Sequence, residues 1–215
     1  MTSGKDVTTL GYERRYNRAL QIDDRDEFVA FMNEGQPVRP ANILNIVAIN
    51  QGKLPLTIDA PEAIALGVDR FVDLSADGHV VVDTRSSAAF GSGHIPSSYN
   101  IHLSSQEFEQ RVGWVTPLDD PILLVLDGDE LARRALHALA FIGLDQRVAG
   151  YLAGGIGAWI GAGQRVATLP QISVHQLSRE LGKDGTMKVL DVREKEEFRE
   201  GHLDGAISLP AVSWR

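Results

Sequence analysis

The stretch that decides the fold is Val80-Val81-Val82-Asp83-Thr84-Arg85, which is followed by Phe90 and by Gly93-His94-Ile95-Pro96. A second version reads Lys188-Val189-Leu190-Asp191-Val192-Arg193, followed by Phe198 and Gly201-His202-Leu203. The Asp, Arg, Phe, Gly and His residues all recur at one offset of 108 residues. This offset is the size of a small domain and is far too long for a solenoid unit. The sequence therefore predicts a tandem of two related domains.

Short apolar runs between turn residues predict the secondary structure of the first copy. A continuous apolar run is typical of a strand that is buried on both faces. Strands that alternate with helices indicate a mainly parallel α/β sheet covered on both sides, which is a three-layer α/β/α fold. The predicted strands are 80–82, 99–103, 122–126 and 148–152, and the predicted helical segments are 86–90, 128–142 (ended by Gly143) and a short one around Ala158-Trp159.

The second copy begins near Ile172 and contains only the first half of the pattern. It predicts a helix at 174–181 and strands at 187–192 and 206–209, with no equivalent of residues 122–142. We expect such a half-domain to leave an open sheet edge and an uncovered apolar face. The partner that covers it would be another domain of a parent protein or a second copy of the chain.

Residues 1–57 have a different character and are interpreted as an amino-terminal arm. Asp23 or Asp24 can cap a helix over 25–33, and the prolines in 36–40 predict an extended linker. The apolar run 42–50 has no clear period.

Composition excludes several functions. The 215 residues include 21 Lys+Arg and 29 Asp+Glu, which gives a net charge of −8 and disfavours nucleic-acid binding. There is no cysteine, so disulfides, thiolate metal sites and thiol nucleophiles are excluded for this chain. No apolar segment approaches the length that spans a bilayer. We expect a cytoplasmic protein that binds neither nucleic acid nor membrane.

The signature Asp83-x-Arg85 with Phe90, Gly93-His94-Ile95-Pro96 and Asn100-Ile101 closely resembles the rhodanese (sulfurtransferase) homology domain. The closing segment Leu152-Ala153-Gly154-Gly155-Ile156-Gly157-Ala158-Trp159 is also similar to that family. The resemblance implies one complete rhodanese-like domain at 58–166 and a truncated second one at 172–215.

The arm is similar to the tail of the metallo-β-lactamase-fold domain in bacterial fusions with rhodanese domains, such as persulfide-dioxygenase-like proteins. The similarity lies in Leu10-Gly11-Tyr12-Glu13-Arg14-Arg15-Tyr16-Asn17 and Pro40-Ala41-Asn42-Ile43. The His-x-His-x-Asp-His metal motif of that fold is absent from the sequence. The resemblance implies that this chain is the carboxy-terminal part of a longer protein, whose missing part carries the metal-dependent chemistry.

Rhodanese chemistry uses a cysteine at the end of the fourth strand, and the matching position in this chain is Asp127. A carboxylate cannot carry sulfane sulfur, and its charge repels an anionic donor. The resemblance thus implies a catalytically inactive domain without a cofactor, with a vestigial loop formed by Asp127, Gly128, Asp129 and Glu130. Its role would be docking, scaffolding or regulation in persulfide metabolism. Alternatively, missing parts of the parent protein supply sulfurtransferase activity.

Two further interpretations of Asp127 follow from its neighbours. As an N-cap, Asp127 would form a capping box with Glu130 at the start of the helix. An apolar strand followed by Asp127-x-Asp129 also resembles the first motif of Mg²⁺-dependent haloacid-dehalogenase-type phosphatases. That family needs a later lysine and an acidic pair, but Lys183, Lys188 and Lys195 all fall in the second copy, so this alternative is disfavoured.

The repeated polar residues are interpreted as a structural motif rather than a catalytic site. We expect Asp83 and Arg85 to pair, and His94 to hydrogen-bond the Gly93 bend to the strand end. Asp191, Arg193, Gly201 and His202 repeat the motif in a half-domain that has no active loop to serve, which favours scaffolding. The histidines show no metal-ligand spacing, so no metal site is predicted.

Overall fold

The computed structural model describes residues 7–34, 42–55, 57, 62–117, 119–181 and 187–210. The chain divides into two compact units, Met1–Arg39 and Pro40–Arg215. The linker predicted at 36–40 lies outside the described residues, as does Lys183. None of the described helices is long and apolar enough to cross a membrane.

The first unit consists of helices with side-chain caps. Helix α1 (Leu10–Tyr16) is capped by Thr9, the 3₁₀ helix η1 (Arg18–Gln21) by Asn17, and α2 (Arg25–Asn33) by Asp24. The Asp24 carboxylate accepts a hydrogen bond from the Glu27 amide at 2.9 Å, which settles the choice between Asp23 and Asp24. A cap of this kind stabilises a helix by about 1 kcal/mol.

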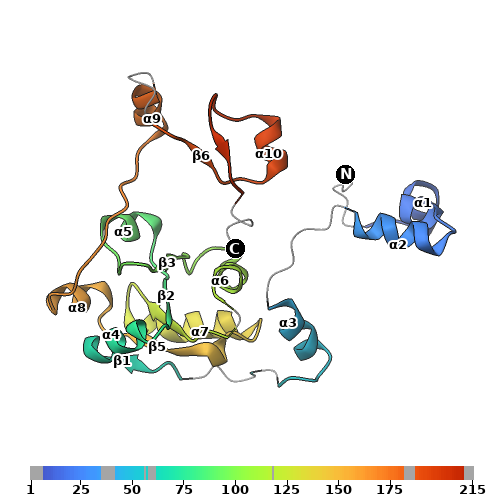
Figure 1. The fold of residues 1–215 in the computed structure, drawn as a ribbon. Coiled ribbons are helices and arrows are strands. Elements are labelled where there is room, and N and C mark those ends of the chain that lie inside the picture. The colour runs from blue at the N-terminus through green and yellow to red at the C-terminus, as the bar shows by residue number, and fades with distance from the viewer. Residues whose placement is uncertain are drawn as a thin grey trace. The chain divides into compact units, whose positions relative to one another are not determined.

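The second unit is built on a five-stranded, fully parallel sheet with the order β1-β5-β4-β2-β3 (Figure 1). Parallel order and helical connections confirm the predicted α/β class. The strands are β1 (Ala65–Leu66), β2 (Val80–Asp83), β3 (Tyr99–Asn100), β4 (Ile122–Val125) and β5 (Val148–Leu152).

Helices before, between and after these strands complete the outer layers. They are α3 (Ile43–Asn50), α4 (Val68–Ala76), α5 (Ser87–Ser92), α6 (Phe108–Val115), α7 (Ala132–Ala140) and α8 (Gly155–Gly161), with 3₁₀ turns η2 (Asp129–Leu131) and η3 (Asp145–Arg147). The apolar run 42–50, whose period is ambiguous in the sequence, is helical. Its Ile46 packs against the core of the sheet.

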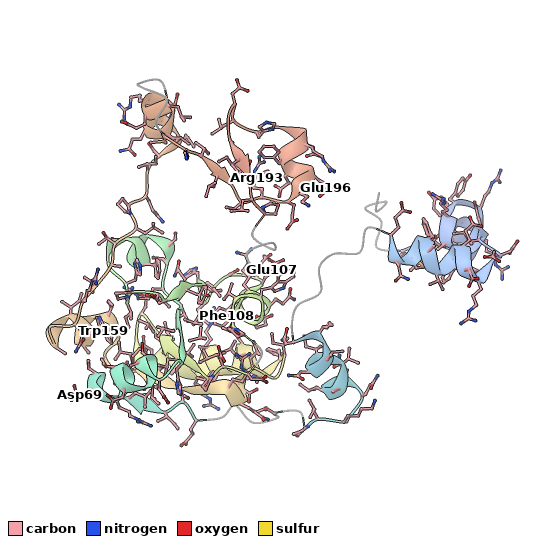
Figure 2. All side chains as sticks on the ribbon, viewed as in Figure 1. Asp69, Glu107, Phe108, Trp159, Arg193 and Glu196 are labelled. Carbon is pink, nitrogen blue, oxygen red and sulfur yellow. The ribbon has the colours of Figure 1, made fainter. Side chains whose placement is uncertain are left out.

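The central strand β4 explains why the sheet is covered on both faces. All four of its residues are fully buried, and successive side chains alternate between two apolar clusters. Ile122 and Leu124 pack in the cluster that includes Phe108 of α6. Leu123 and Val125 pack in the cluster that includes Trp159 of α8, and Figure 2 labels both aromatic side chains. Each such burial contributes about 1.5–3 kcal/mol before the entropy of folding is subtracted.

The second copy forms only the first part of this fold. It contains α9 (Val174–Leu181), α10 (Lys195–Glu200) and the two-stranded parallel sheet of β6 (Leu190–Asp191) and β7 (Ile207–Ser208). The register of β6 and β7 pairs Leu190 with Ile207 and Asp191 with Ser208. The corresponding pairs in the first copy are Val82 with Tyr99 and Asp83 with Asn100, so the offset of 108 residues extends to strand register.

Candidate functional site

The candidate site lies at the carboxyl edge of the parallel sheet, where open α/β folds bind their ligands. Thr84 joins the ends of β2 and β4, because its amide and its hydroxyl both donate to the Val125 carbonyl, at 2.8 and 3.0 Å. Beyond β4 the chain passes through buried Leu126 to Asp127, which is exposed to solvent. Asp127, the residue that the sequence predicts at the position of the rhodanese cysteine, is therefore an accessible carboxylate at the end of the central strand.

The loop after β4 is held by Asp129 rather than by Asp127. The Asp129 Oδ1 atom accepts a hydrogen bond from the Gly154 amide at 3.0 Å, which connects this loop to the one that follows β5. The Glu130 carboxylate occupies the place that a Cβ on Gly128 would take. The carboxylates of Asp129 and Glu130 thus both lie against glycine backbone of the chain itself.

The predicted helix cap at Asp127 is wrong. The segment begins as the 3₁₀ turn η2, with Gly128 as its N-cap and no side-chain cap, and α7 then starts at Ala132 without a side-chain cap. The predicted helix over 128–142 is accordingly shorter. In the same segment Asp129 binds Gly154, an interaction between residues 25 positions apart that sequence spacing does not encode.

Gly155 brings the loop after β5 against the end of β4. Its φ of +56° lies in the left-handed region, and a Cβ at this position would lie 2.7 Å from the Leu126 carbonyl oxygen. Only glycine permits this conformation and this approach without strain. The Gly154-Gly155 pair therefore determines how closely the two loops meet at the candidate site.

Asp83 and Arg85 form a buried ion pair, with side chains 0% and 6% exposed. Arg85 Nε donates to Asp83 Oδ1 at 2.9 Å, and Arg85 Nη2 donates to Oδ2 at 2.6 Å. The same Nη2 atom donates to the Gly93 carbonyl at 2.8 Å. Because both charged groups are satisfied by each other and by the bend, neither is available to bind a substrate.

His94 does not link the bend to the strand end as expected, since Arg85 makes that link. The His94 Nδ1 atom lies 2.9 Å from the Phe90 carbonyl, and the imidazole stacks on the Phe90 ring with centroids 3.7 Å apart. Because a carbonyl oxygen can only accept, Nδ1 carries the proton. The His94 backbone also exchanges two hydrogen bonds of 2.9 Å with Ala167. These contacts hold helix α5 and the bend together.

The second copy repeats this motif atom for atom. Arg193 Nη2 donates to Asp191 Oδ2 at 2.6 Å and to the Gly201 carbonyl at 2.7 Å, and His202 Nδ1 lies 2.8 Å from the Phe198 carbonyl. The hydrogen bonds from Arg193 are the main reason that the pKa of Asp191 is lower than usual, and the nearby charge of His202 adds to this effect. The same pairing raises the pKa of Arg193.

Sequence reasoning did not identify the role of Asn100. Its Nδ2 atom donates to the carbonyls of Asp83 and Arg85, at 3.0 and 2.8 Å, and so fixes the turn after β2. Asn100 is part of the signature that resembles the rhodanese homology domain, and this membership is the sequence feature that could have indicated its role. At the equivalent position the second copy has Ser208, so this clamp belongs to the first copy alone.

A small polar cavity of about 290 Å³ lies beyond the ends of β2 and β3. Its one guanidinium group, that of Arg111, pairs with Glu107 at 3.1 Å on the surface, so the local charge is largely balanced. Among the residues that the structure describes, no group of three or more His, Asp or Glu side chains could hold a metal ion. The cavity is lined by Ser86, Ser87, Asn100, Ile101, His102, Ser105 and Arg111.

Comparison with known proteins identifies the family. The profile of the rhodanese-like domain matches residues 68–162 and 173–214, which together are more than half of the chain. The chain therefore belongs to the rhodanese-like domain family. No curated protein sequence matches it significantly.

One of the solved structures that this chain resembles has a moderately similar sequence. A metallo-beta-lactamase from Staphylococcus aureus subsp. aureus COL is 30% identical with a TM-score of 0.50, and the match covers 68% of this chain and 40% of that one. A thiosulfate sulfurtransferase from Pseudomonas aeruginosa is 19% identical with a TM-score of 0.42, covering 81% of this chain and 37% of that one. The Alr3790 protein from Anabaena sp. is 18% identical with a TM-score of 0.42, covering 54% of this chain and 87% of that one. The chain thus spans less than half the length of the staphylococcal protein.

Proposed function

We propose that this chain is a non-catalytic rhodanese-like module with a docking, scaffolding or regulatory role in persulfide metabolism. The observation that carries the proposal is Asp127, an exposed carboxylate at the end of the central strand. Transfer of sulfane sulfur needs a thiolate that attacks the donor and holds the sulfur as a persulfide. The sequence contains no cysteine that could take this role.

The loop around Asp127 supports the same proposal through its charge. Asp127, Asp129 and Glu130 stand in one short segment, and Asp129 already accepts the Gly154 amide. Thiosulfate and related donors are anions, so they would meet electrostatic repulsion at this loop, and the Gly154 amide is not free to bind them. The loop is thus suited to closing the carboxyl edge of the sheet rather than to binding a sulfur donor.

We further propose that the module belongs to a larger metallo-hydrolase and rhodanese fusion that acts in the cytoplasm. The 30% identity to the staphylococcal metallo-beta-lactamase, over 40% of that protein, supports this context. In such a fusion the persulfide-dioxygenase-like or sulfurtransferase chemistry would belong to other parts of the protein. The rhodanese-like module would contribute contacts between those parts.

The direct test is a thiosulfate:cyanide sulfurtransfer assay on the purified chain. We expect thiocyanate formation at the rate of buffer alone, with an active rhodanese assayed beside it as the positive control. Turnover above buffer that scales with the concentration of this chain would overturn the proposal.

Restoring the thiol alone should not restore activity. We expect Asp127→Cys to remain about 100-fold or more below an active rhodanese, because anion-stabilising donors contribute that much to such reactions and the Gly154 amide is engaged. The double variant Asp127→Cys with Asp129→Ala frees that amide and should exceed the single variant. Full activity in the single variant would show that the loop already binds the donor.

A further inference from the structure

The polar cavity of about 290 Å³ beyond the ends of β2 and β3 has no role in the proposed function. It lies where three segments meet, namely the start of α5, the loop after β3 and helix α6. A water molecule occupies about 30 Å³ in the liquid, so the cavity has room for a small ligand. None of the described residues 127–130 lines it, so the acidic loop after β4 is not part of its wall.

The serines of this cavity have hydroxyl hydrogens to donate. The Ser86 Oγ atom accepts the Ala89 amide at 3.2 Å, and the Ser105 Oγ atom accepts the Glu107 amide at 3.4 Å. Neither hydroxyl donates to any residue that the structure describes, so each keeps its hydrogen for another acceptor. Ser87 adds a third, exposed hydroxyl. The wall therefore offers several donors to whatever enters the cavity.

Arg111 is the charged donor of the cavity, and it can exchange its partner. Its Nε and Nη2 atoms both donate to one carboxylate oxygen of Glu107, at 3.3 and 3.1 Å. The two side chains are 61% and 59% exposed, and Figure 2 labels Glu107 at the start of α6. Exposed ion pairs of this kind contribute little to stability. An anion in the cavity can therefore compete with Glu107 for the guanidinium.

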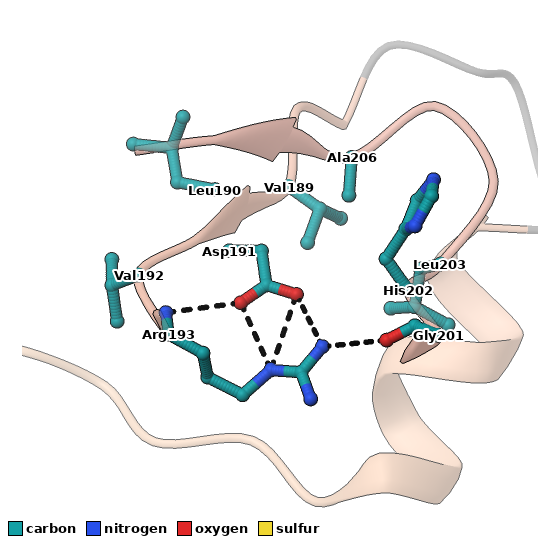
Figure 3. A pocket seen from close by; sticks show the side chains of 9 residues that line it. All are labelled: Val189, Leu190, Asp191, Val192, Arg193, Gly201, His202, Leu203 and Ala206. Atoms are coloured by element: carbon teal, nitrogen blue, oxygen red, sulfur yellow. Dashed lines mark hydrogen bonds and ion pairs between the residues drawn. The ribbon is translucent and has the colours of Figure 1, made fainter. Parts of the chain in front are cut away.

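The second copy shows that the motif beside this cavity does not require the serines. Figure 3 shows its ion pair between Asp191 and Arg193, which has the same geometry as the pair in the first copy. At the offset of 108 residues, Ser86 corresponds to Glu194. Both residues cap the helix that follows them, but a carboxylate has no hydrogen to donate and repels an anion. The donors of the cavity are thus a feature of the first copy.

We propose that this cavity binds a small tetrahedral oxyanion, a group of the sulfate, sulfonate or phosphate type. The hydroxyls of Ser86, Ser87 and Ser105 and the guanidinium of Arg111 would donate to its oxygens. These donors come from three different segments. A carboxylate has its acceptor sites in one plane, whereas the oxygens of a tetrahedral group point in several directions. Hydrogen bonds to an anion are also stronger than those between neutral groups.

This inference goes beyond the proposed function, because Asp127 takes no part in it. The test is an NMR titration of the full chain with sodium sulfate, against sodium chloride at equal ionic strength. We expect saturable shifts of the Ser87 and Ser105 backbone amides. Separate titrations with sodium phosphate and sodium methanesulfonate identify the tetrahedral group that binds best. Sodium acetate should bind at least about tenfold more weakly than that group, because it lacks the additional oxygens.

Two substitutions at α6 should change the affinity in opposite directions. Arg111→Gln should weaken binding by about tenfold or more, because it removes the charged donor. Glu107→Gln should strengthen binding by up to about fivefold, because it removes the carboxylate that competes for Arg111. The Glu107 side chain makes no cap hydrogen bond, so its loss should not shorten the helix.

Arg133→Gln is the matched control for the charge. Arg133 is an exposed residue of α7 outside the cavity, so this variant removes the same positive charge without removing a ligand. We expect its affinity for sulfate to stay within about twofold of that of the unmodified chain, because salt screens charges that lie apart on the surface.

Four results would overturn the proposal. One is the absence of saturable shifts at Ser87 and Ser105 with all three tetrahedral anions. Another is equal weakening by Arg111→Gln and Arg133→Gln, which would indicate non-specific attraction to positive charge. The third is weaker binding in Glu107→Gln, and the fourth is acetate binding as tightly as the tetrahedral anions. The sulfurtransfer assay does not depend on this cavity, so the two proposals fail independently.

Discussion

Two Asp-x-Arg pairs with the same geometry stand in different surroundings within one chain. In each pair the arginine Nη2 atom lies 2.6 Å from the aspartate Oδ2 atom. The first pair is buried, whereas the arginine of the second pair is 45% exposed. Because geometry is constant and burial varies, the two copies separate the effect of solvent from the effect of the contact itself.

Removing the arginine should therefore destabilise the protein to very different extents in the two copies. We expect Arg85→Gln to destabilise the protein by about 3–5 kcal/mol, because it leaves the fully buried Asp83 carboxylate unpaired. The equivalent Arg193→Gln should cause a much smaller loss, because the Arg193 side chain is 45% exposed and water screens the pair. Urea unfolding followed by circular dichroism measures both variants. Equal losses in the two would contradict this account of burial.

The exposed pair should be visible in the titration of Asp191. Hydrogen bonds from Arg193 lower the pKa of this carboxyl, so Asp191 should titrate below an ordinary aspartate in an NMR pH series. A lowered folded-state pKa means that the pair favours folding above the ordinary aspartate pKa. That contribution is lost as the pH falls through the folded-state value.

Arg193→Gln provides the control for this titration. It should return the Asp191 midpoint toward the ordinary value, whereas His202→Gln should move it less, because hydrogen bonding by Arg193 is the larger cause. An Asp191 midpoint that does not respond to Arg193→Gln would refute the pairing in solution.

The sequence indicates which single residues matter at the candidate site, but not what they contact. Asp127 could be placed after the central strand because the apolar run 122–126 is unambiguous. The contact from Asp129 to Gly154 could not be predicted, because it joins two loops that only the folded sheet brings together. A capping box is a local pattern, and the folded loop has Gly128 rather than Asp127 as the N-cap.

At the scale of secondary-structure elements, the junction of β5 and α8 depends on Gly155. We expect Gly155→Ala to destabilise the protein by about 2 kcal/mol or more, because φ is +56° and the new Cβ would meet the Leu126 carbonyl oxygen at 2.7 Å. Midpoints of urea unfolding measure the loss.

Gly157, two residues further along the same helix, is the matched control. A Cβ there has nothing within 4 Å and the backbone is not left-handed, so Gly157→Ala should stabilise by up to about 1 kcal/mol. A similar loss in both variants would mean that the close approach at Gly155 is not what destabilises the junction.

Strands were predicted best where apolar runs are continuous, as at 80–82, 122–126 and 148–152. Strand β1 has two residues and no run to reveal it, and it is defined by its pairing with β5. Helix α4 has a helical period in its sequence, since Val68, Phe71 and Leu74 share one helical face, and Phe71 and Leu74 are buried. Hydrophobic periodicity does not reveal an element such as β1, because the strand is short and is defined only by its pairing in the folded sheet.

At the scale of the whole molecule, burial is distributed unevenly between the two copies. The first copy contains both apolar clusters, whereas among the described residues of 172–210 only Pro210 is buried. Local stability follows burial and protected hydrogen bonds. The chain should therefore behave as one firmly folded domain followed by a segment of low stability.

Hydrogen exchange measured by mass spectrometry on the full chain tests this contrast. Peptides that contain β2 and β4 should exchange about a thousandfold more slowly than peptides that contain β6 and β7, because the former open only when the sheet unfolds. Comparable protection in the two regions would contradict the burial difference. It would indicate that another segment or molecule shields β6 and β7 from solvent.

The ring from Asp191 through Arg193 to Gly201 closes within one short run of consecutive residues. A unit of this kind requires no distant segment, so it can assemble on the ribosome as soon as its own stretch has emerged from the exit tunnel. The next strand of the sheet then pairs with a strand edge that has already formed, and only its register remains to be found. Because the motif is local and is synthesised before the strand that follows it, it would act as the folding nucleus of each copy.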